Sequence, residues 1–503
     1  MFKRNLIANY IGQGWVALMN LAFIPQYVKY LGIESYGLIG LLFLMQAWLV
    51  LLDMGMTPAL GREMARFTAG AHSTQSIRDL LRSIELVALG VAISIAAGVW
   101  FASGWLAKNW LNAITLSVET ISQAFTIIGL VIALRLIEGI YRSSILGLQR
   151  QVLFNVINSA MATFRNVGAV LILVWVSPTI EAFFLWQVLV SILTLLGLAL
   201  ATYRVLPKAD RPARFSPPAL QGIWNFAGGV MGITFLYLML VQVDKIVLSK
   251  LLNLSEYGNY MLASAVAGAL FMLCQPIAQA IFPRLNELHA QNDLSRFIKT
   301  YHQGAQLISV IMGSAAVVMI VFAEQIIKLW TQDEEIANNT ATLVSLLALG
   351  NFLNGLMWIP NQAQLAHGWT SLAIRINIVA VLIIVPVIFW VAPRYGAVGA
   401  AWVWVCLNAG YVLIGTLFMY RRMLQNEKIR WYKDDLILPI GAALIAAMII
   451  KKLIPSAHMP AFLQLLTIGG GSVVILLISG MSASIVREKM RVLISGSKFL
   501  LIR

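Results

Sequence analysis

The stretch Ile121–Gly147, ISQAFTIIGLVIALRLIEGIYRSSILG, is long and apolar enough to cross a bilayer, yet it carries Arg135, Glu138 and Arg142. A charge in the hydrocarbon core costs roughly 2.5–3.5 kcal/mol on insertion scales, so it is retained where it faces water or a partner. The spacing i, i+3 and i+7 places the three charges on one helix face. Arg165 lies deep in the next apolar stretch. The pattern predicts a water-filled cationic cavity that holds an anion within a membrane.

The composition extends this interpretation to the whole chain. Hydrophobic residues make up 60% and charged residues 11% of the 503 residues, against about 45–50% and about 25% in soluble domains. Roughly 20 apolar residues span a bilayer. The sequence therefore predicts an all-α polytopic membrane protein with about 14 transmembrane helices, at residues 8–31, 37–60, 84–106, 121–147, 152–176, 181–203, 223–249, 257–281, 304–327, 341–364, 371–392, 396–420, 436–454 and 461–481.

The 36 lysines and arginines indicate the orientation of the chain. With a cytoplasmic N-terminus, the alternate loops put 26 of them on the cytoplasmic side and 7 outside, and 3 lie within apolar stretches. Because cytoplasmic loops carry the excess of positive charge, we predict that both termini are cytoplasmic. The net charge of +15 then reflects topology, and we expect no nucleic-acid partner.

An internal repeat is indicated by three matches at similar offsets. Leu31–Gly37 returns loosely as Leu252–Gly258 at an offset of 221, and Pro58 matches Pro283 at 225. The polar placement of 146–158 returns in 365–377 at an offset of 219. Because six helices are an even number, two lobes built this way have the same orientation in the membrane.

The repeat and the proline-rich basic stretch after residue 203 predict the domain organisation. We expect an N-terminal six-helix lobe over 1–205, a cytoplasmic linker over 206–221 and a C-terminal six-helix lobe over 222–425. Residues 426–503 are then an additional helix pair and a basic cytoplasmic tail, which we expect to lie on anionic membrane lipid.

No soluble-enzyme signature is present in the sequence, which has no Walker A run, HExxH, CxxC or GxSxG motif. The five histidines fall in predicted loops or at helix ends without metal-ligand spacing, which favours solvated side chains; they are His72, His289, His302, His367 and His458. We therefore expect no catalytic residue, no metal site and no cofactor, and we predict that the protein is not an enzyme.

The buried cations are the predicted substrate-binding residues. Arginine binds phosphate bidentately and stays charged, so we assign a cationic lumen to Arg135 and Arg165, with Arg142 as an entry residue and Lys245 as a further member. Two other interpretations stay open. Arg135 and Glu138 could form a structural pair, and Lys245 could extend its ammonium group to the interface.

Three acids lie within or beside the apolar stretches. Asp53, Asp244 and Glu138 are candidates for ion coupling. Asp244 is adjacent to Lys245, so a local ion pair is an equally good interpretation of that residue.

Amide side chains form polar stripes on single predicted helices: Asn9, Gln13 and Asn20 on the first, Asn155 and Asn158 with Arg165 on the fifth, and Asn351, Asn354 and Asn361 with Trp358 on the tenth. A polar lumen is predicted to consist of Asn155, Asn158, Asn351, Asn354, Trp358 and Asn361. Such residues could hydrogen-bond sugar hydroxyls, with Trp358 stacking on a pyranose ring. The alternative is interhelical hydrogen bonding, worth about 0.6 kcal/mol per contact.

These features together resemble the polysaccharide-type flippases of the multidrug/oligosaccharidyl-lipid/polysaccharide (MOP) exporter superfamily, in particular the O-antigen (Wzx-type) flippases. The resemblance covers the whole chain and rests on diffuse patterns, namely Leu31–Gly37, Asp53-Met54-Gly55 before Arg62-Glu63, Gly147-Leu148-Gln149-Arg150, and Asp244-Lys245 before Tyr257–Tyr260.

The resemblance implies a MATE/MurJ-like pair of lobes around a central cavity, in a bacterial inner membrane. The substrate would be an undecaprenyl-pyrophosphate-linked oligosaccharide, flipped to the periplasmic leaflet by alternating access. Residues 436–481 would form a groove for the lipid tail, as the additional helix pair does in lipid II flippases. A glycan polymerase and a chain-length regulator are expected protein partners. The alternatives are a multidrug antiporter, a lipid II flippase, and a membrane glycan polymerase or ligase.

Overall fold

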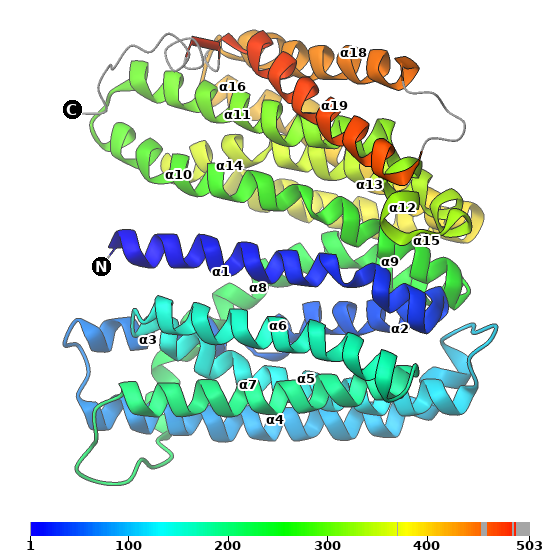
Figure 1. Ribbon diagram of the computed structural model, residues 1–503. Helices are drawn as coiled ribbons and strands as arrows, with labels where there is room; N and C mark the ends of the chain where they lie inside the picture. Colours follow the sequence, from blue (N-terminus) through cyan, green and yellow to red (C-terminus); the bar gives the residue numbers. More distant parts are fainter. Residues whose placement is uncertain (1, 370, 454–459, 485–486, 489–503) are drawn as a thin grey trace. The chain divides into compact units, whose positions relative to one another are not determined.

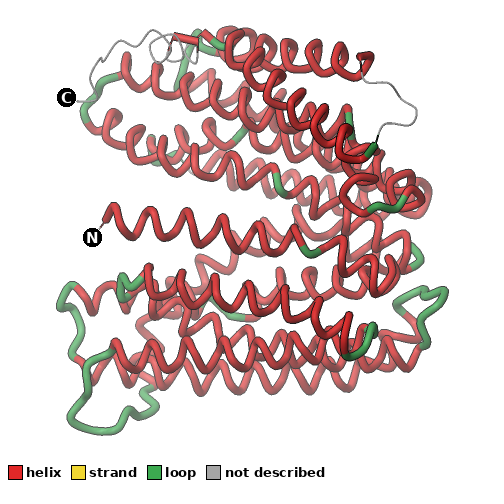
Figure 2. Tube along the Cα trace, viewed as in Figure 1, coloured by secondary structure: helices red, strands yellow, loops and turns green. Residues whose placement is uncertain are grey.

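The computed structural model describes residues 2–369, 371–453, 460–484 and 487–488. Within these ranges the secondary structure is helical, joined by turns and short loops, with a single isolated bridge between Asn112 and Asn253 (Figures 1 and 2). The predicted all-α class is therefore confirmed. The chain divides into two compact units, residues 1–258 and 259–503.

Helices α1 to α8 lie in the first unit and are coloured from blue to green in Figure 1. They are α1 (Phe2–Ala22), α2 (Ile24–Leu52), α3 (Met56–Thr68), α4 (Thr74–Asn109), α5 (Val118–Gly147), α6 (Gln151–Trp175), α7 (Ile180–Val205) and α8 (Pro217–Leu251). Helix α5 packs against both α4 and α7, and α1 packs against α6. These contacts bring residues of α1, α2, α5, α6 and α7 around one space, described below.

Helix α9 (Leu254–Gly268) begins in the first unit and continues into the second. The other helices of the second unit are α10 (Leu270–Ala290), α11 (Leu294–Val321), α12 (Ala323–Thr331), α13 (Glu334–Leu356), α14 (Trp358–Ala366), α15 (Ser371–Gly410), α16 (Thr416–Arg422), α17 (Lys428–Arg430), α18 (Leu438–Leu453) and α19 (Ala461–Ser482), with π-helical turns η1 (Tyr411–Gly415) and η2 (Trp431–Ile437). The predicted limits 1–205, 206–221, 222–425 and 426–503 stay predictions. Residues 489–503 of the predicted basic tail lie outside the described residues.

Eleven helical segments among the described residues are long and apolar enough to cross a membrane. The chain is thus a multi-pass membrane protein, while the predicted count of about 14 is not confirmed. One of the eleven, Ser371–Arg422, has 52 residues and contains a break at Gly396, where φ is +56°. Since about 20 residues cross a bilayer, this one segment covers both predicted stretches 371–392 and 396–420.

The structure also interrupts helices that the sequence predicted to be continuous. Stretch 37–60 is broken between α2 and α3, where Met54 and Gly55 have positive φ angles of 51° and 74°. Asp53 stabilises this break, because its carboxylate accepts hydrogen bonds from the backbone N–H (2.9 Å) and the hydroxyl (2.7 Å) of Thr57. The hydrophobic pattern continues through the break and therefore does not reveal it.

The predicted repeat is visible in the backbone of two corresponding turns. Gln149, after α5, has φ +56°, and Gly368, after α14, has φ +67°. These residues are 219 positions apart, the offset found in the sequence. The three hydrogen bonds around them also correspond: Leu148 N to Ser144 O, Gln149 N to Leu146 O and Arg150 N to Ile145 O in the first turn, and His367 N to Ala363 O, Gly368 N to Leu365 O and Trp369 N to Gln364 O in the second.

Candidate functional site

A polar cavity of about 390 Å³ lies among five helices of the first unit. Its wall combines apolar side chains with two guanidinium groups and several amides. The lining residues are Asn20, Tyr27, Ile39, Leu42, Phe43, Gln46, Ala47, Arg135, Arg165, Asn166, Phe183 and Gln187. Arg135 and Arg165, which the sequence assigned to one lumen, therefore share one cavity.

Arg135 reaches the cavity from α5 and is held by amides. One terminal nitrogen, Nη1, donates to Oε1 of Gln46 in α2, and Nη2 lies 3.4 Å from Oε1 of Gln187 in α7. Its Nε is buried without a hydrogen-bond partner. No ion pair joins it to Glu138, which also has an unpartnered buried oxygen, Oε2. The interpretation of Arg135 and Glu138 as a direct structural ion pair is not supported.

Arg165 reaches the same cavity from α6, and its Nε is likewise buried without a partner. No carboxylate is present among the residues that line the cavity. Two cations facing one space repel each other, and a buried charge without a counter-ion is costly. An anion bound between the two guanidinium groups would offset both penalties and satisfy the free N–H groups.

A hydrogen-bonded chain forms the side of the cavity near α1. The Tyr27 hydroxyl donates to Oδ1 of Asn166 (2.9 Å), and Nδ2 of Asn166 lies 3.3 Å from Oδ1 of Asn20. Of these residues the sequence singled out Asn20 only as part of a polar stripe. Gln46 and Gln187 were missed, although each is an isolated amide in a strongly apolar helix, and that isolation is the signal that could have revealed them.

The other predicted cations lie elsewhere. Arg142 is exposed, and its guanidinium carbon is 5.4 Å from the ring centroid of Phe154. Lys245 donates to the Val241 carbonyl oxygen (2.9 Å) and pairs with Asp244 at 3.4 Å. Neither Arg142 nor Lys245 lines the cavity of Arg135. Asp244 thus makes the local ion pair that was the alternative interpretation of its role.

Three of the six predicted polar lumen residues form hydrogen bonds with neighbouring helices. Asn155 donates to Oδ1 of Asn9 in α1 (2.6 Å). In the second unit, Asn354 donates to Asn408 (2.8 Å) and Asn351 accepts from the indole of Trp404 (2.9 Å). These contacts match the alternative of interhelical hydrogen bonding. Their role toward a sugar stays a prediction.

The remaining members of that set show no common site in the structure. Trp358 stacks on Phe271, with ring centroids 6.1 Å apart, Asn158 is half-buried in α6, and Asn361 is exposed.

The prediction of a solvated side chain is wrong for His302. His302 lies inside α11 and its side chain is 0% exposed, between Oδ2 of Asp435 and Oε2 of Glu427 (2.9 Å from Nε2). Gln306 donates to the other oxygen of Asp435 (2.9 Å). The sequence could not show this contact because Asp435 is 133 residues away. His458 lies outside the described residues.

The chain is similar in sequence to known proteins. A family model described as "Polysaccharide biosynthesis protein" matches residues 29–333. A Shigella flexneri protein provisionally named an O-antigen transporter is 19% identical over 401 residues, which cover 80% of this chain and 93% of that protein.

Two solved structures resemble the chain over most of its length. The lipid II flippase MurJ in an inward closed conformation has a TM-score of 0.70 at 13% identity and covers 97% of this chain and 99% of its own. An inward-facing multidrug resistance MATE family transporter of the MOP superfamily has a TM-score of 0.63 at 15% identity, with 82% and 96% covered. At these identities the likeness shows the fold, and it confirms the predicted MATE/MurJ-like architecture.

Proposed function

The chain belongs to the polysaccharide biosynthesis protein family, and from this premise we propose that it flips undecaprenyl-pyrophosphate-linked O-antigen or polysaccharide repeat units from the cytoplasmic to the periplasmic leaflet of a bacterial inner membrane. A role as a polysaccharide or O-antigen flippase is supported by the family and by the O-antigen transporter relative. The lipid-linked pyrophosphate substrate is our own assignment, argued below from the cavity.

The single observation that carries the assignment is the pairing of Arg135 and Arg165 across one acid-free cavity. A pyrophosphate presents several oxygens with negative charge, and arginine binds such groups through two parallel N–H donors. Gln46 and Gln187 line the same space, and their amide nitrogens offer hydrogen bonds to the sugar next to the phosphate. A headgroup with an anionic pyrophosphate at one end and a polar sugar at the other can bind both the arginines and the amides.

The same observation argues against the multidrug antiporter. A transporter of organic cations needs acids facing its cavity, whereas this cavity presents two arginines and no carboxylate. A lipid II flippase would use the same anionic headgroup chemistry and differs in the sugar, so it stays an alternative. For a glycan polymerase or ligase, the cavity supplies no carboxylate, histidine, lysine, serine or cysteine as a nucleophile or general base.

Transport would proceed by alternating access. The arginine pair binds the pyrophosphate from the cytoplasmic side, the prenyl tail stays in lipid, and a change of conformation releases the sugar outward. The excess of positive charge in alternate loops favours cytoplasmic termini. Asp53, Asp244 and Glu138 stay candidates for ion coupling.

Complementation of a deletion strain tests the proposal. Arg135→Gln and Arg165→Gln should each fail to restore surface glycan while reaching the membrane in normal amounts. Arg296→Gln is the matched control, because Arg296 is exposed and lies outside the cavity. Restoration of surface glycan by both cavity variants would refute the assignment.

A further inference from the structure

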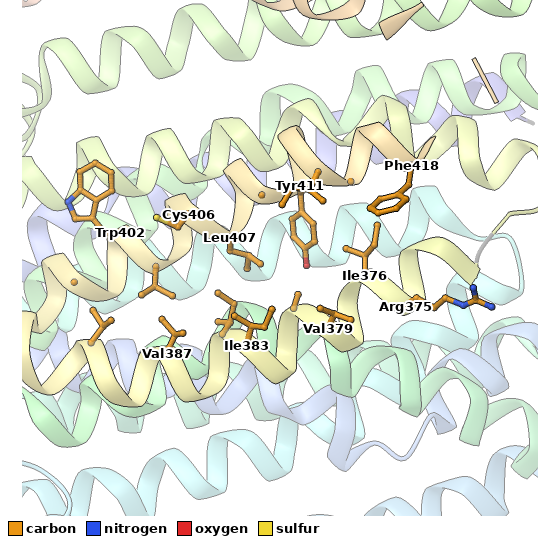
Figure 3. Close-up of a pocket in the computed structure, with 18 of the residues that line it drawn as sticks. Arg375, Ile376, Val379, Ile383, Val387, Trp402, Cys406, Leu407, Tyr411 and Phe418 are labelled. Atoms are coloured by element: carbon orange, nitrogen blue, oxygen red, sulfur yellow. The ribbon is translucent and has the colours of Figure 1, made fainter. Parts of the chain in front are cut away.

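A large apolar groove separates the two halves of α15 in the second unit (Figure 3). After the break at Gly396 the second half runs back along the first, so that the Tyr411 hydroxyl donates to Oδ1 of Asn377 (3.1 Å). The groove has a volume of about 1140 Å³. Side chains enter it from both halves, among them Ile376, Val379, Ile383 and Val387 from the first and Trp402 and Leu407 from the second (Figure 3).

The chemistry of the wall excludes a polar occupant. Among its side chains only Arg375, Tyr411, Tyr395, the indole of Trp402 and the weakly polar Cys406 carry polar atoms. The hydroxyl of Tyr411 is already bonded to Asn377, and Arg375 lies at one end of the groove (Figure 3). A sugar or a drug headgroup inside would therefore lose most of its hydrogen bonds to water without replacement, whereas hydrocarbon would not.

The first unit contains a helix pair that corresponds to the halves of α15 in the repeat and is closely packed. The halves of α15 correspond to α6 and α7 at the offset of 219. There Trp186 packs so closely on Gly168 that a Cβ on the glycine would overlap the indole, which also donates to the Arg165 carbonyl oxygen (3.0 Å). At the same offset α15 carries Val387, which lines the groove, and Val405, which does not.

The length of the groove distinguishes between lipids. Leu372 and Val391 both line it, and at 1.5 Å per residue they are about 29 Å apart along the helix. The hydrocarbon core is about 30 Å thick, so one leaflet supplies about 15 Å. A phospholipid tail fills only its own leaflet, whereas a long polyprenyl chain can follow the whole groove.

We propose that the α15 groove holds the polyprenyl tail of the flipped lipid during loading, with the diphosphate beside Arg375. This inference rests on the proposed function and adds a second contact site for the same substrate. Arg375 is the one charged side chain of the wall, and it lies near the start of α15, at the end predicted to be cytoplasmic, where the substrate is loaded. The tail site expected in 436–481 is replaced in this proposal by residues 372–418.

Photocrosslinking tests the proposal. The protein in lipid nanodiscs is irradiated with undecaprenyl diphosphate that carries a diazirine near the tail end, and labelled peptides are mapped by mass spectrometry. Phosphatidylglycerol with a diazirine on its acyl chain is the second probe. We expect the prenyl probe to label 372–418 preferentially. Equal labelling by the phospholipid probe, or prenyl labelling concentrated in 438–482, would overturn the proposal.

Gly410→Leu blocks the groove with little risk to folding. Gly410 is helical, lines the groove, and has no heavy atom within 4 Å of the position that a Cβ would occupy. The matched control is Gly441→Leu in α18, which is equally open but outside the groove. Gly410→Leu should lower prenyl labelling of 372–418 by about tenfold, the equivalent of about 1.4 kcal/mol, whereas Gly441→Leu should not.

A second pair of variants uses two adjacent residues of one helix. Ile383 lines the groove and Leu382 does not, although both are exposed. Ile383→Trp should reduce labelling and flipping together, and Leu382→Trp should leave both unchanged. Normal flipping by Gly410→Leu and Ile383→Trp would refute the groove while leaving the proposed function intact. A wild-type protein that flips no lipid-linked glycan would instead refute the proposed function.

Discussion

Gly37 packs directly against the backbone of Leu254, so that a Cβ on Gly37 would lie 2.6 Å from the Leu254 carbonyl oxygen. A reciprocal contact brings Gly258 against the carbonyl oxygen of Ile33. In the repeat with an offset of 221, Gly37 corresponds to Gly258 and Ile33 corresponds to Leu254. The two contacts are therefore equivalent. The two copies of the repeated stretch, Leu31–Gly37 and Leu252–Gly258, therefore pack on each other with local twofold symmetry.

Gly37→Ala and Gly258→Ala should each destabilise the protein. The atom that the new methyl group meets belongs to the backbone, which cannot rotate away, and overpacking of this kind costs about 1–3 kcal/mol. Thermal unfolding in detergent, followed by monodispersity, measures the effect. Gly90→Ala in α4, with no heavy atom within 4 Å of its Cβ position, should be neutral or stabilising. A Gly258→Ala variant as stable as Gly90→Ala would disprove the close contact.

Charge removal in the arginine pair should weaken headgroup binding. A hydrogen bond to a charged group contributes about 1.5–3 kcal/mol, so Arg135→Gln or Arg165→Gln should lower the affinity for undecaprenyl diphosphate by roughly 10- to 100-fold. Arg135→Lys should rescue only part of this loss, because lysine lacks the planar fork. Microscale thermophoresis measures the affinity, with Arg296→Gln as the control. Unchanged affinity in both cavity variants would contradict the pairing.

The cluster around His302 should stabilise the second unit. His302→Ala leaves the buried side chain of Asp435 with Gln306 as a donor but without its imidazole partner, and a buried polar group that loses a hydrogen-bond partner costs about 1–3 kcal/mol. The unfolding temperature should fall markedly. Arg296→Ala is the control, because it removes a mostly exposed cation paired with Asp293. Equal unfolding temperatures for the two variants would show that the His302 contacts contribute nothing.

Glu63 makes the turn after α3 sensitive to acid. Burial acts to raise the pKa of Glu63, but hydrogen bonds from His72 (2.6 Å) and Arg66 (3.1 Å), together with their charges, outweigh it and hold the pKa below its usual value. A lowered pKa means that this stabilisation is present above about pH 4.3, the ordinary value for glutamate, and is lost as the pH falls through the folded-state value.

Hydrogen exchange of residues 66–73 measures this dependence. Exchange in the wild type should accelerate below about pH 4.3 beyond the intrinsic pH effect, and Glu63→Gln should abolish the acceleration. Persistence of the acid step in Glu63→Gln would assign it to another group.

The sequence predicted the features that depend on local pattern. The apolar stretches become helices, and the turns at Gln149 and Gly368 correspond at the offset found by comparing residues 146–158 with 365–377. The cavity of Arg135 and Arg165 was also predictable, because an arginine deep in an apolar stretch requires water or a partner.

Features that depend on contacts between distant helices were not predictable. Gln187 and Gln46 meet Arg135 across 52 and 89 residues, and His302 meets Asp435 across 133. No periodicity in a single helix encodes such pairs. The α15 groove was missed for a related reason, because its walls come from two segments, 371–392 and 396–420, whose packing on each other no single-helix pattern encodes.

The location of the lipid-linked glycan in cells that lack this protein tests the central claim most directly. The account predicts that single undecaprenyl-pyrophosphate-linked repeat units accumulate on the cytoplasmic leaflet, with surface glycan lost and with both effects reversed by the wild-type chain but not by Arg135→Gln. Single units that reach the periplasmic leaflet and remain unpolymerised, or surface glycan that stays intact, would contradict it.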